Sequence, residues 1–334
     1  MRKLLLYICF TCFAACATQQ SNFQVSDDST TFAKTISKID LQNIVYKLAS
    51  NEFEGRKSGE NGQKLAANYL ADFYKKLNIK AAQGDDKYFQ NIPKDFFKGS
   101  SNADSENVVA FIEGSRHPNQ YVIVSAHYDH LGNKYGEIFY GADDNASGTS
   151  AVLEIAEAFK EATLAGHRPK RSIVFLNLTG EEEGLYGSKY YTSQPIFPLE
   201  NTVANLNIDM IGRVDEAHKN DTNFVYLIGS DKLSTELHNV SETANATYTH
   251  LNLDYTYNDE NDPNRFYYRS DHYNFAKHNI PIIFYFNGVH DDYHQSTDTP
   301  DKINYDLLAK RAQLVFYTAW EIANRPTKLK LDKN

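Results

Sequence analysis

The chain has 334 residues, of which 41% are hydrophobic and 23% are charged, a composition typical of a globular protein with a sizeable core. Its formal net charge is −9, from 43 acidic residues against 34 lysines and arginines. Binding to nucleic-acid phosphates requires clustered basic residues, and the sequence has no Lys/Arg-rich run. We therefore expect no nucleic-acid partner.

The amino-terminal residues have the pattern of an export signal. Two basic residues precede an apolar run, 4–13, which is too short to span a bilayer as a helix. The run leads into Ala14-Ala15-Cys16, which resembles the lipobox of bacterial lipoproteins. We expect a lipoprotein-type signal peptide over residues 1–16 and a lipid anchor at Cys16 as the only membrane contact. This predicts an exported protein at the outer membrane, facing the periplasm or the cell surface; an ordinary cleaved signal peptide is the alternative.

The rest of the chain is expected to form a tether and one domain. Residues 17–31 are rich in Gln, Ser, Asn and Asp, which favours a flexible tether. No repeat and no Pro/Gly-rich linker divides residues 32–325, so we predict a single domain there. All three cysteines lie within the first 16 residues. Any metal site in the domain must therefore use histidines and carboxylates.

Helical and strand patterns alternate along this domain. Apolar residues recur at helical spacing over 65–77, again over 152–159, and in a last helix over 308–322. Short, almost continuously apolar runs predict central strands covered on both faces: Val108–Ile112, Tyr121–Val124, Ser172–Leu178, Val203–Ile208, Phe224–Ile228 and Ile282–Phe286. The alternation predicts an α/β fold, a three-layer αβα sandwich around a mixed, largely parallel sheet. Part of the long polar stretch 215–269 is expected to form a loop over the site.

Acidic residues or histidines follow several of these strands. His127-Tyr128-Asp129, Glu181-Glu182, Asp209 and His294 all do so, and an Asp143-Asp144 pair precedes a predicted helix. In open α/β sheets, ligands gather at the carboxyl ends of the strands. Two divalent ions ~3.5–4 Å apart need a carboxylate able to bridge them, together with a histidine and a carboxylate each. Such ligands without thiolate suit zinc, and they could also hold cobalt or manganese.

Five segments carry a resemblance to a known family. They are SAHYDHLG, GADDNASG, TGEEEGLYGS, NIDMIGR and YHQSTDTPDKI, in this order. Together they resemble the co-catalytic two-zinc aminopeptidases, whose family also contains glutamate carboxypeptidase and the transferrin receptor. The resemblance runs from about Leu48 to the last helix and implies a zinc-dependent exopeptidase fold with two zinc ions per chain.

The resemblance also implies a role for each matching residue. The implied metal ligands are His127 and Asp209 on one ion, Glu182 and His294 on the other, and Asp144 bridging both. Asp144 is selected rather than Asp143 because the family's bridging carboxylate lies four residues before the final glycine. The family has a cis peptide bond at this point, which predicts one between Asp144 and Asn145.

Three further residues match catalytic positions. Glu181 matches the general base, Asp129 the carboxylate that orients His127, and Tyr293 a tyrosine that polarises the scissile carbonyl in some members. Glu183 is expected to be solvated, and His272 is left open between a site-lining and a structural role.

The implied activity is removal of residues from peptides with a free amino terminus. Two alternatives on the same scaffold stay open: a carboxypeptidase or dipeptidase, which would need a cation such as Arg213 or Arg269 for the substrate carboxylate, and glutaminyl cyclase. A non-catalytic relative that lost its ligands is a third, although all five ligand positions and the general base are present here.

Overall fold

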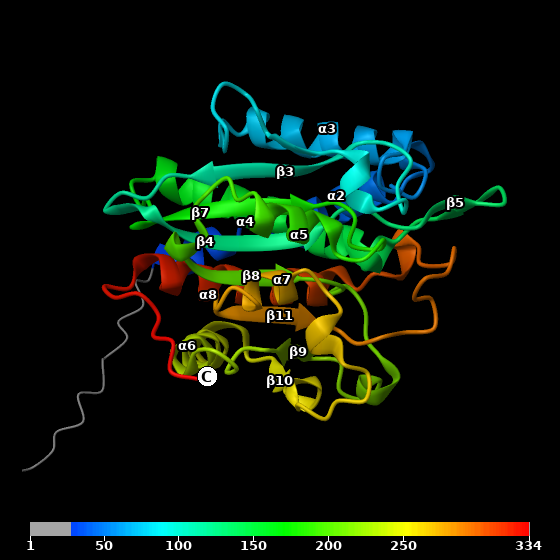
Figure 1. The fold of residues 1–334 in the computed structure, drawn as a ribbon. Coiled ribbons are helices and arrows are strands. Elements are labelled where there is room, and N and C mark those ends of the chain that lie inside the picture. The colour runs from blue at the N-terminus through cyan, green and yellow to red at the C-terminus, as the bar shows by residue number, and fades with distance from the viewer. Residues whose placement is uncertain (1–27, 334) are drawn as a thin grey trace, which may run out of the picture.

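A nine-stranded sheet runs through the centre of the protein, whose computed structural model describes residues 28–333 (Figure 1). The strands lie in the order β1-β3-β7-β4-β8-β11-β9-β10, and β2 pairs with β3. Their bounds are β1 Lys80–Ala81, β2 Phe89–Ile92, β3 Ser105–Ile112, β4 His117–His127, β7 Arg171–Leu178, β8 Thr202–Ile208, β9 Phe224–Ile228, β10 Asn252–Asp254 and β11 Ile282–Phe286. A separate hairpin is formed by β5, Gly132–Lys134, and β6, Glu137–Phe139.

The four strands in the middle of the sheet are parallel. β4 pairs in parallel with both β7 and β8, and β8 pairs in parallel with β11. On either side, β3 is antiparallel to β7 and β9 is antiparallel to β11. All residues of β7 and β8 are buried, as expected for strands covered on both faces. The carboxyl ends of the four parallel strands therefore open onto the same edge of the sheet.

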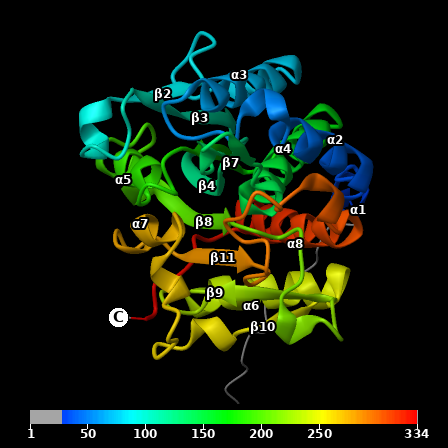
Figure 2. The same cartoon turned by 90° about the vertical axis from the view of Figure 1, so that its right-hand side faces the viewer.

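Helices cover both faces of the sheet, which confirms the predicted three-layer α/β fold (Figure 2). α4 and α8 pack directly against β4, β7 and β8, and α5 and α7 lie on the opposite side. The helices are α1 Asp28–Ala33, α2 Lys38–Leu48, α3 Asn61–Lys76, α4 Gly148–Leu164, α5 Tyr186–Ser193, α6 Thr235–Ala244, α7 His272–Ala276 and α8 Tyr305–Asn324. The predicted helices correspond to α3, α4 and α8, and each predicted strand lies within an observed one.

The helix α8 illustrates how the sequence pattern produces the packing. The stripe of apolar residues that predicts the helix is buried throughout, because it faces the sheet and its neighbouring helices. The helix begins after Asn304, whose side-chain oxygen accepts a hydrogen bond from the backbone N–H of Leu307. It carries Trp320 and Phe316, which stack against Phe159 of α4 at 5.8 and 4.9 Å between ring centroids.

Both predicted domain boundaries need correction. The tether was expected to reach residue 31, but residues from 28 onward form α1, which buries Ser29 and Ala33 and stacks Phe32 on Trp320 at 6.0 Å. At the other end, Leu329 is buried in the core, so the packed structure continues beyond residue 325. The predicted signal peptide, Cys16 and the first part of the tether lie outside the described residues.

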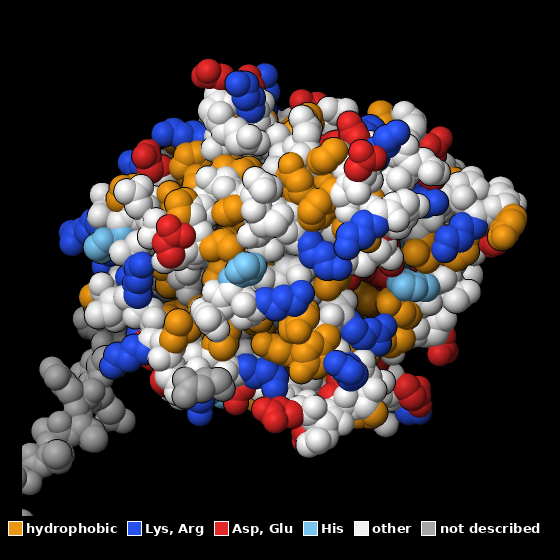
Figure 3. Space-filling view, viewed as in Figure 1, with side chains coloured by type: hydrophobic (Ala, Val, Ile, Leu, Met, Phe, Trp, Pro, Cys, Tyr) orange, Lys and Arg blue, Asp and Glu red, His pale blue; other side chains and the backbone are white. Residues whose placement is uncertain are grey.

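The surface carries charges of both signs. On the face seen in Figure 3, lysines, arginines and acidic side chains are interspersed among apolar and neutral polar groups. In the part of the chain that the structure describes, no helix has both the length and the apolar character needed to cross a bilayer.

Candidate metal centre

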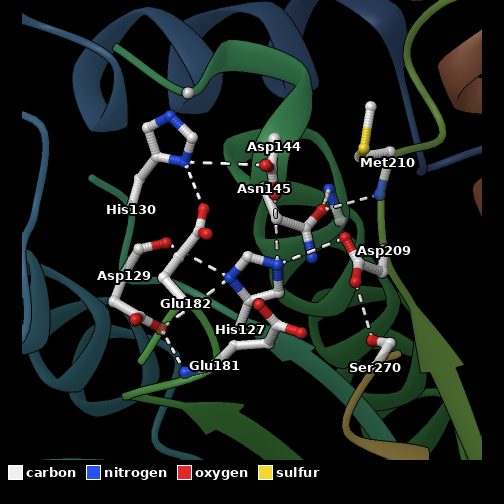
Figure 4. Close-up of polar contacts among 12 residues, drawn as sticks. His127, Asp129, His130, Asp144, Asn145, Glu181, Glu182, Asp209, Met210 and Ser270 are labelled. Atoms are coloured by element: carbon white, nitrogen blue, oxygen red, sulfur yellow. Dashed lines mark hydrogen bonds and ion pairs between the residues drawn. The ribbon is translucent and has the colours of Figure 1, made fainter. Parts of the chain in front are cut away.

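The five predicted metal ligands meet at the carboxyl edge of the parallel strands; Figure 4 shows four of them, His127, Asp144, Glu182 and Asp209, and His294 contacts Asp144 and Glu182. His127 is the last residue of β4, and Asp209 directly follows β8. Glu182 follows β7, Asp144 lies just before α4, and His294 lies on the loop after β11. Residues up to 167 positions apart in the sequence thus reach one site because the parallel strands end together.

One group of possible ligands surrounds His127. Its Nε2 lies 3.2 Å from Oδ1 of Asp209 and 3.3 Å from Oδ1 of Asp144. All three residues are buried, and their ligand atoms lie within 4.8 Å of one another. Imidazole nitrogen and carboxylate oxygens converging in this way form a suitable site for zinc.

A second group lies on the other side of Asp144. The Nε2 of His294 lies 3.1 Å from Oδ2 of Asp144 and 3.2 Å from Oε2 of Glu182. Asp144 therefore directs one carboxylate oxygen toward each group, which is the arrangement that a bridging ligand requires. The His294 side chain is 36% exposed, whereas those of Asp144 and Glu182 are 5% exposed.

A third histidine, His130, also belongs to the second group. Its Nδ1 lies 2.7 Å from Oε1 of Glu182 and 3.7 Å from Oδ2 of Asp144. His130, Asp144 and Glu182 place ligand atoms within 4.8 Å of one another. The sequence interpretation missed His130, although it lies only three residues after His127.

The backbone around Asp144 is fixed by Asp298. The Asp298 carboxylate accepts hydrogen bonds from the backbone N–H groups of Asp143 and Asp144, at 3.0 and 3.1 Å. The side chain of Asp143 instead accepts from the N–H of Gly212 and contacts His290. Asp144 is thus the residue of this pair that faces the histidines, and the cis peptide bond predicted between Asp144 and Asn145 is present.

Asp129 contacts His127 through its backbone carbonyl as well as through the predicted carboxylate. The backbone carbonyl of Asp129 lies 3.2 Å from Nδ1 of His127, while its carboxylate Oδ1 is 3.7 Å away. The carboxylate also accepts hydrogen bonds from the backbone N–H of Glu181 at 3.3 Å and the hydroxyl of Ser58 at 3.0 Å. Asp129 therefore connects the His127 strand end to the Glu181 turn.

Arg56 forms hydrogen bonds with several of the backbone segments next to the site. Its guanidinium is fully buried and donates to the backbone carbonyls of Leu48, Tyr128, Tyr140 and Gly141, at 2.6 to 2.9 Å. These bonds connect α2 to the segments that precede the metal ligands. Burial lowers the pKa of Arg56 to about 10, which leaves it charged at neutral pH.

A pocket opens beside the first group of ligands. Its lining combines the carboxylates of three residues, five apolar side chains, one tyrosine and one arginine: Asp144, Glu181, Asp209, Met210, Phe266, Phe284, Phe286, Val289, Tyr293 and Arg269. Only Phe266 and Arg269 come from the stretch 215–269 that was expected to cover the site. The same stretch also contains β9, α6 and β10.

The two remaining predicted catalytic residues both line this pocket. Burial, together with the charges of Asp209 and Glu182, raises the pKa of Glu181 well above its usual range. The ring of Tyr293 stacks on His294 at 3.8 Å between centroids, and burial raises the pKa of the Tyr293 hydroxyl, which stays protonated at neutral pH.

The ligand groups influence one another strongly. Burial would lower the pKa of His127, but Asp209 and the hydrogen bonds of Asp129 and Asp144 raise it well above the usual value. Burial acts in the same direction on His294, whose pKa is nevertheless raised to about 10 by Asp144 and Glu182. The site therefore gathers enough negative charge to bind cations, whether protons or metal ions.

Two expectations for neighbouring residues are resolved by their contacts. Glu183 is half-buried rather than solvated, and burial together with the Asp129 charge raises its pKa to about 8. His272 has a structural role, because its ring stacks on Phe284 at 4.6 Å and its Nε2 bonds the carbonyl of Tyr267. Neither outcome could be read from the local sequence, since both depend on residues packed from other elements.

The fold and the site define a class of metal-dependent hydrolases. A family model described as Peptidase family M28 matches residues 107–319, more than half of the chain, and the chain belongs to this family. The peptidases of this family hydrolyse peptide bonds, which agrees with the resemblance seen in the sequence.

Comparisons with individual proteins agree with this assignment. A Pyricularia oryzae protein named "Probable zinc metalloprotease" is 27% identical over 264 residues, covering 67% of this chain and 51% of the relative. The chain spans about half or less of the length of the curated relatives it matches.

Two of the solved structures that share the fold are aminopeptidases by name. The LapA aminopeptidase of Legionella pneumophila has a TM-score of 0.70 and 19% identity, covering 98% of this chain and 81% of LapA. BSAP, a zinc aminopeptidase from Bacillus subtilis, has a TM-score of 0.68 and 18% identity, covering 88% of this chain and 97% of BSAP.

Proposed function

We propose that this chain is an aminopeptidase that uses two zinc ions to hydrolyse the amino-terminal peptide bond of its substrates. The observation that carries the proposal is the position of Asp144, which lies between two groups of ligands and presents one oxygen to each. Glu181 lines the adjacent pocket without belonging to either group.

The residues present fit zinc. Both groups offer only imidazole nitrogens and carboxylate oxygens, a set that zinc accepts and that cobalt or manganese could also use. Four buried or nearly buried carboxylates, those of Asp144, Glu181, Glu182 and Asp209, lie close together, an excess of negative charge that divalent cations would offset. The names of a sequence relative and a structural neighbour both mention zinc.

In the proposed reaction, Glu181 is the general base. Bound zinc would lower the pKa of a water molecule and polarise the scissile carbonyl. Glu181 accepts the proton of the attacking water and then transfers it to the nitrogen of the leaving amine. Glu181 lines the pocket without belonging to either ligand group, so its carboxylate is available for both proton transfers. The Tyr293 hydroxyl, which is protonated, can donate a hydrogen bond to the developing oxyanion.

The lining of the pocket favours the amino end of a peptide. The phenylalanines of this pocket suit an apolar side chain on the first residue of a peptide, and a zinc ion bound beside them would accept a free amino group as a ligand. A carboxypeptidase or dipeptidase would need a free cation at this place. Arg213 is held by Asp292 at 2.9 Å, whereas Arg269 lines the pocket with its guanidinium over the ring of Phe266, and the experiment below tests whether it binds a substrate carboxylate.

One experiment separates the candidate activities. The zinc-loaded protein is incubated separately with an unmodified ten-residue peptide that begins with leucine, with a second such peptide that begins with glutamine, and with the dipeptide Leu-Leu, and the products are followed by mass spectrometry. An aminopeptidase removes residues successively from the amino end. Removal from the carboxyl end would indicate a carboxypeptidase, cleavage of dipeptides only would indicate a dipeptidase, and loss of ammonia from the glutamine peptide alone would indicate a cyclase.

The cellular localisation of the protein is a separate proposal. We infer from the sequence around Cys16 that the protein is exported and anchored by a lipid at that residue. Metabolic labelling with a radioactive fatty acid tests this, because Cys16→Ser should abolish the label while leaving the peptidase domain unchanged.

A further inference from the structure

We propose that His130 is a ligand of the second zinc ion, which it binds through Nδ1 together with Asp144, Glu182 and His294. The inference rests on the proposed two-zinc function, but it goes beyond it, because the resemblance to the family assigns His127 and His294 as the only histidine ligands. His130 would make the second site richer in protein ligands than the first.

The surroundings of the His130 ring support this role. The residue is 0% exposed, and within the described residues neither ring nitrogen has a hydrogen-bond partner. Nδ1 lies 2.7 Å from Oε1 of Glu182, yet that oxygen is also without a hydrogen bond, because the two atoms are close but not aligned as donor and acceptor. Buried polar atoms that are left without partners cost free energy. A cation bound between the two groups would satisfy both of these atoms.

The position of the ring is fixed by its neighbours. A Cβ atom on Gly141 would lie 2.4 Å from Cγ of His130, so the ring packs closely against this glycine, whose φ is +55°. The backbone N–H of His130 donates to the carbonyl of Arg56 at 3.3 Å. On the other side, the ring of His294 meets it at 6.0 Å between centroids and 67° between planes. Figure 4 shows the His130 ring directed at Glu182 and Asp144, on the side of Asp144 opposite Asp209.

The two zinc sites are therefore unequal. The first contains three protein ligands, His127, Asp144 and Asp209. The second contains four, because His130 is added to the three that the family resemblance implies. Four protein ligands complete the tetrahedral coordination that zinc prefers, whereas three leave a position open. We expect the second site to bind zinc more tightly than the first.

Zinc affinity tests this inference without relying on catalytic activity. The protein is stripped with a chelator, and zinc is titrated back in competition with a chromogenic chelator for the wild type, His130→Ala, His130→Asn and the control His278→Ala, which alters an exposed histidine. For His130→Ala we expect the tighter of the two zinc ions to bind at least about tenfold more weakly, with the other nearly unchanged. Circular dichroism of the metal-free proteins checks that each variant folds.

His130→Asn separates a ligand from a hydrogen-bond donor. The asparagine amide nitrogen can occupy the place of Nδ1 and donate to Glu182, but it does not replace an imidazole ligand. We therefore expect His130→Asn to bind zinc as weakly as His130→Ala. Wild-type affinity in either variant would overturn the inference while leaving the two-zinc proposal intact, whereas a wild-type protein that binds no zinc would overturn both.

A measurement on the unaltered protein covers the case in which the variants do not fold. With ¹⁵N-labelled histidine and ¹¹³Cd in place of zinc, a scalar coupling between cadmium and Nδ1 of His130 requires a direct bond. Observation of this coupling supports the inference. Its absence in a protein that shows couplings for His127 and His294 would overturn it.

Discussion

The hydroxyl of Ser270 donates a 2.7 Å hydrogen bond to Oδ2 of Asp209, whose other oxygen lies 3.2 Å from Nε2 of His127. The bond determines which oxygen of Asp209 faces the first ligand group. Ser270 also accepts a hydrogen bond from the amide of Asn207 at 3.0 Å, so its orientation is fixed in turn by β8. Such supporting bonds orient metal ligands and influence metal affinity.

Replacing this hydroxyl should weaken the first zinc site. We expect Ser270→Ala to lower the affinity of the more weakly bound zinc ion by about 10- to 100-fold, because Asp209 loses the donor that orients it. Competition with a chromogenic chelator measures this, and Ser193→Ala, an exposed serine, is the matched control. Equal zinc affinities in the wild type and Ser270→Ala would show that Asp209 does not bind metal in this orientation.

Glu181→Gln should separate catalysis from metal binding. Because Glu181 moves the proton but holds no zinc, we expect kcat to fall by about 10²- to 10⁴-fold while the zinc content stays that of the wild type. Metal analysis and steady-state kinetics on the same preparation test both parts. Glu200→Gln, on the surface, should change neither. If Glu181→Gln lost zinc in proportion to its activity, Glu181 would have to be reassigned as a ligand.

Arg56 should contribute strongly to stability. Arg56→Ala leaves four buried backbone carbonyls without their charged donor, and we expect the free energy of unfolding to fall by roughly 3–5 kcal/mol. Arg56→Lys should recover only part of this, because an ammonium group has three donors and lacks the planar fork. Urea unfolding of the metal-free proteins measures the difference, with exposed Arg116→Ala as control. A loss below about 1 kcal/mol in Arg56→Ala would contradict the assignment.

Glu154 should make stability depend on pH. Burial, and next the charges of Glu157 and Asp40, raise its pKa to about 8 from an ordinary value of 4.5. The folded state thus binds this proton more tightly than the unfolded state, so the stabilising contribution is complete below about pH 4.5 and is lost as pH rises toward 8.

The neutral variant Glu154→Gln should remove this dependence. We expect it to match the wild type near pH 5 and to be more stable by a few kcal/mol near pH 9, since each pKa unit corresponds to about 1.4 kcal/mol. Urea unfolding with chelator present, at both pH values, tests this against exposed Glu161→Gln. Identical pH dependence in the wild type and Glu154→Gln would show that Glu154 is not the group responsible.

Much of the fold was predictable because its central elements have clear patterns. The central strands β4, β7 and β8 contain almost continuous apolar runs, and α8 has an apolar stripe of helical period. The short strands β1 and β10 have only two and three residues and give no such pattern. α1 was assigned to the tether because its composition is polar, and only its packing against Trp320 reveals the helix.

The site was predictable to the extent that its residues follow strand ends. His127 is the last residue of β4, Glu182 lies shortly after β7, and Asp209 directly follows β8. The five motifs occur along the chain in the same order as in the family. Asp298, by contrast, accepts a hydrogen bond from the backbone N–H of Asp144, which lies 154 positions away in the sequence. No local sequence pattern predicts that contact. His130 was visible in the motif, but its importance depends on the two ring nitrogens being buried without partners, which is a property of the folded structure.

The most direct test of the proposed function compares leucine p-nitroanilide with N-acetyl-leucine p-nitroanilide on the zinc-loaded protein. The proposed aminopeptidase requires a free amino group on its substrate, and the acetylated substrate lacks the basic nitrogen that a bound zinc ion would accept. We predict chelator-sensitive hydrolysis of the free substrate, with kcat/KM at least about 100-fold above that of the acetylated substrate. Equal hydrolysis of the two, or hydrolysis that survives removal of the metal, would contradict a zinc aminopeptidase.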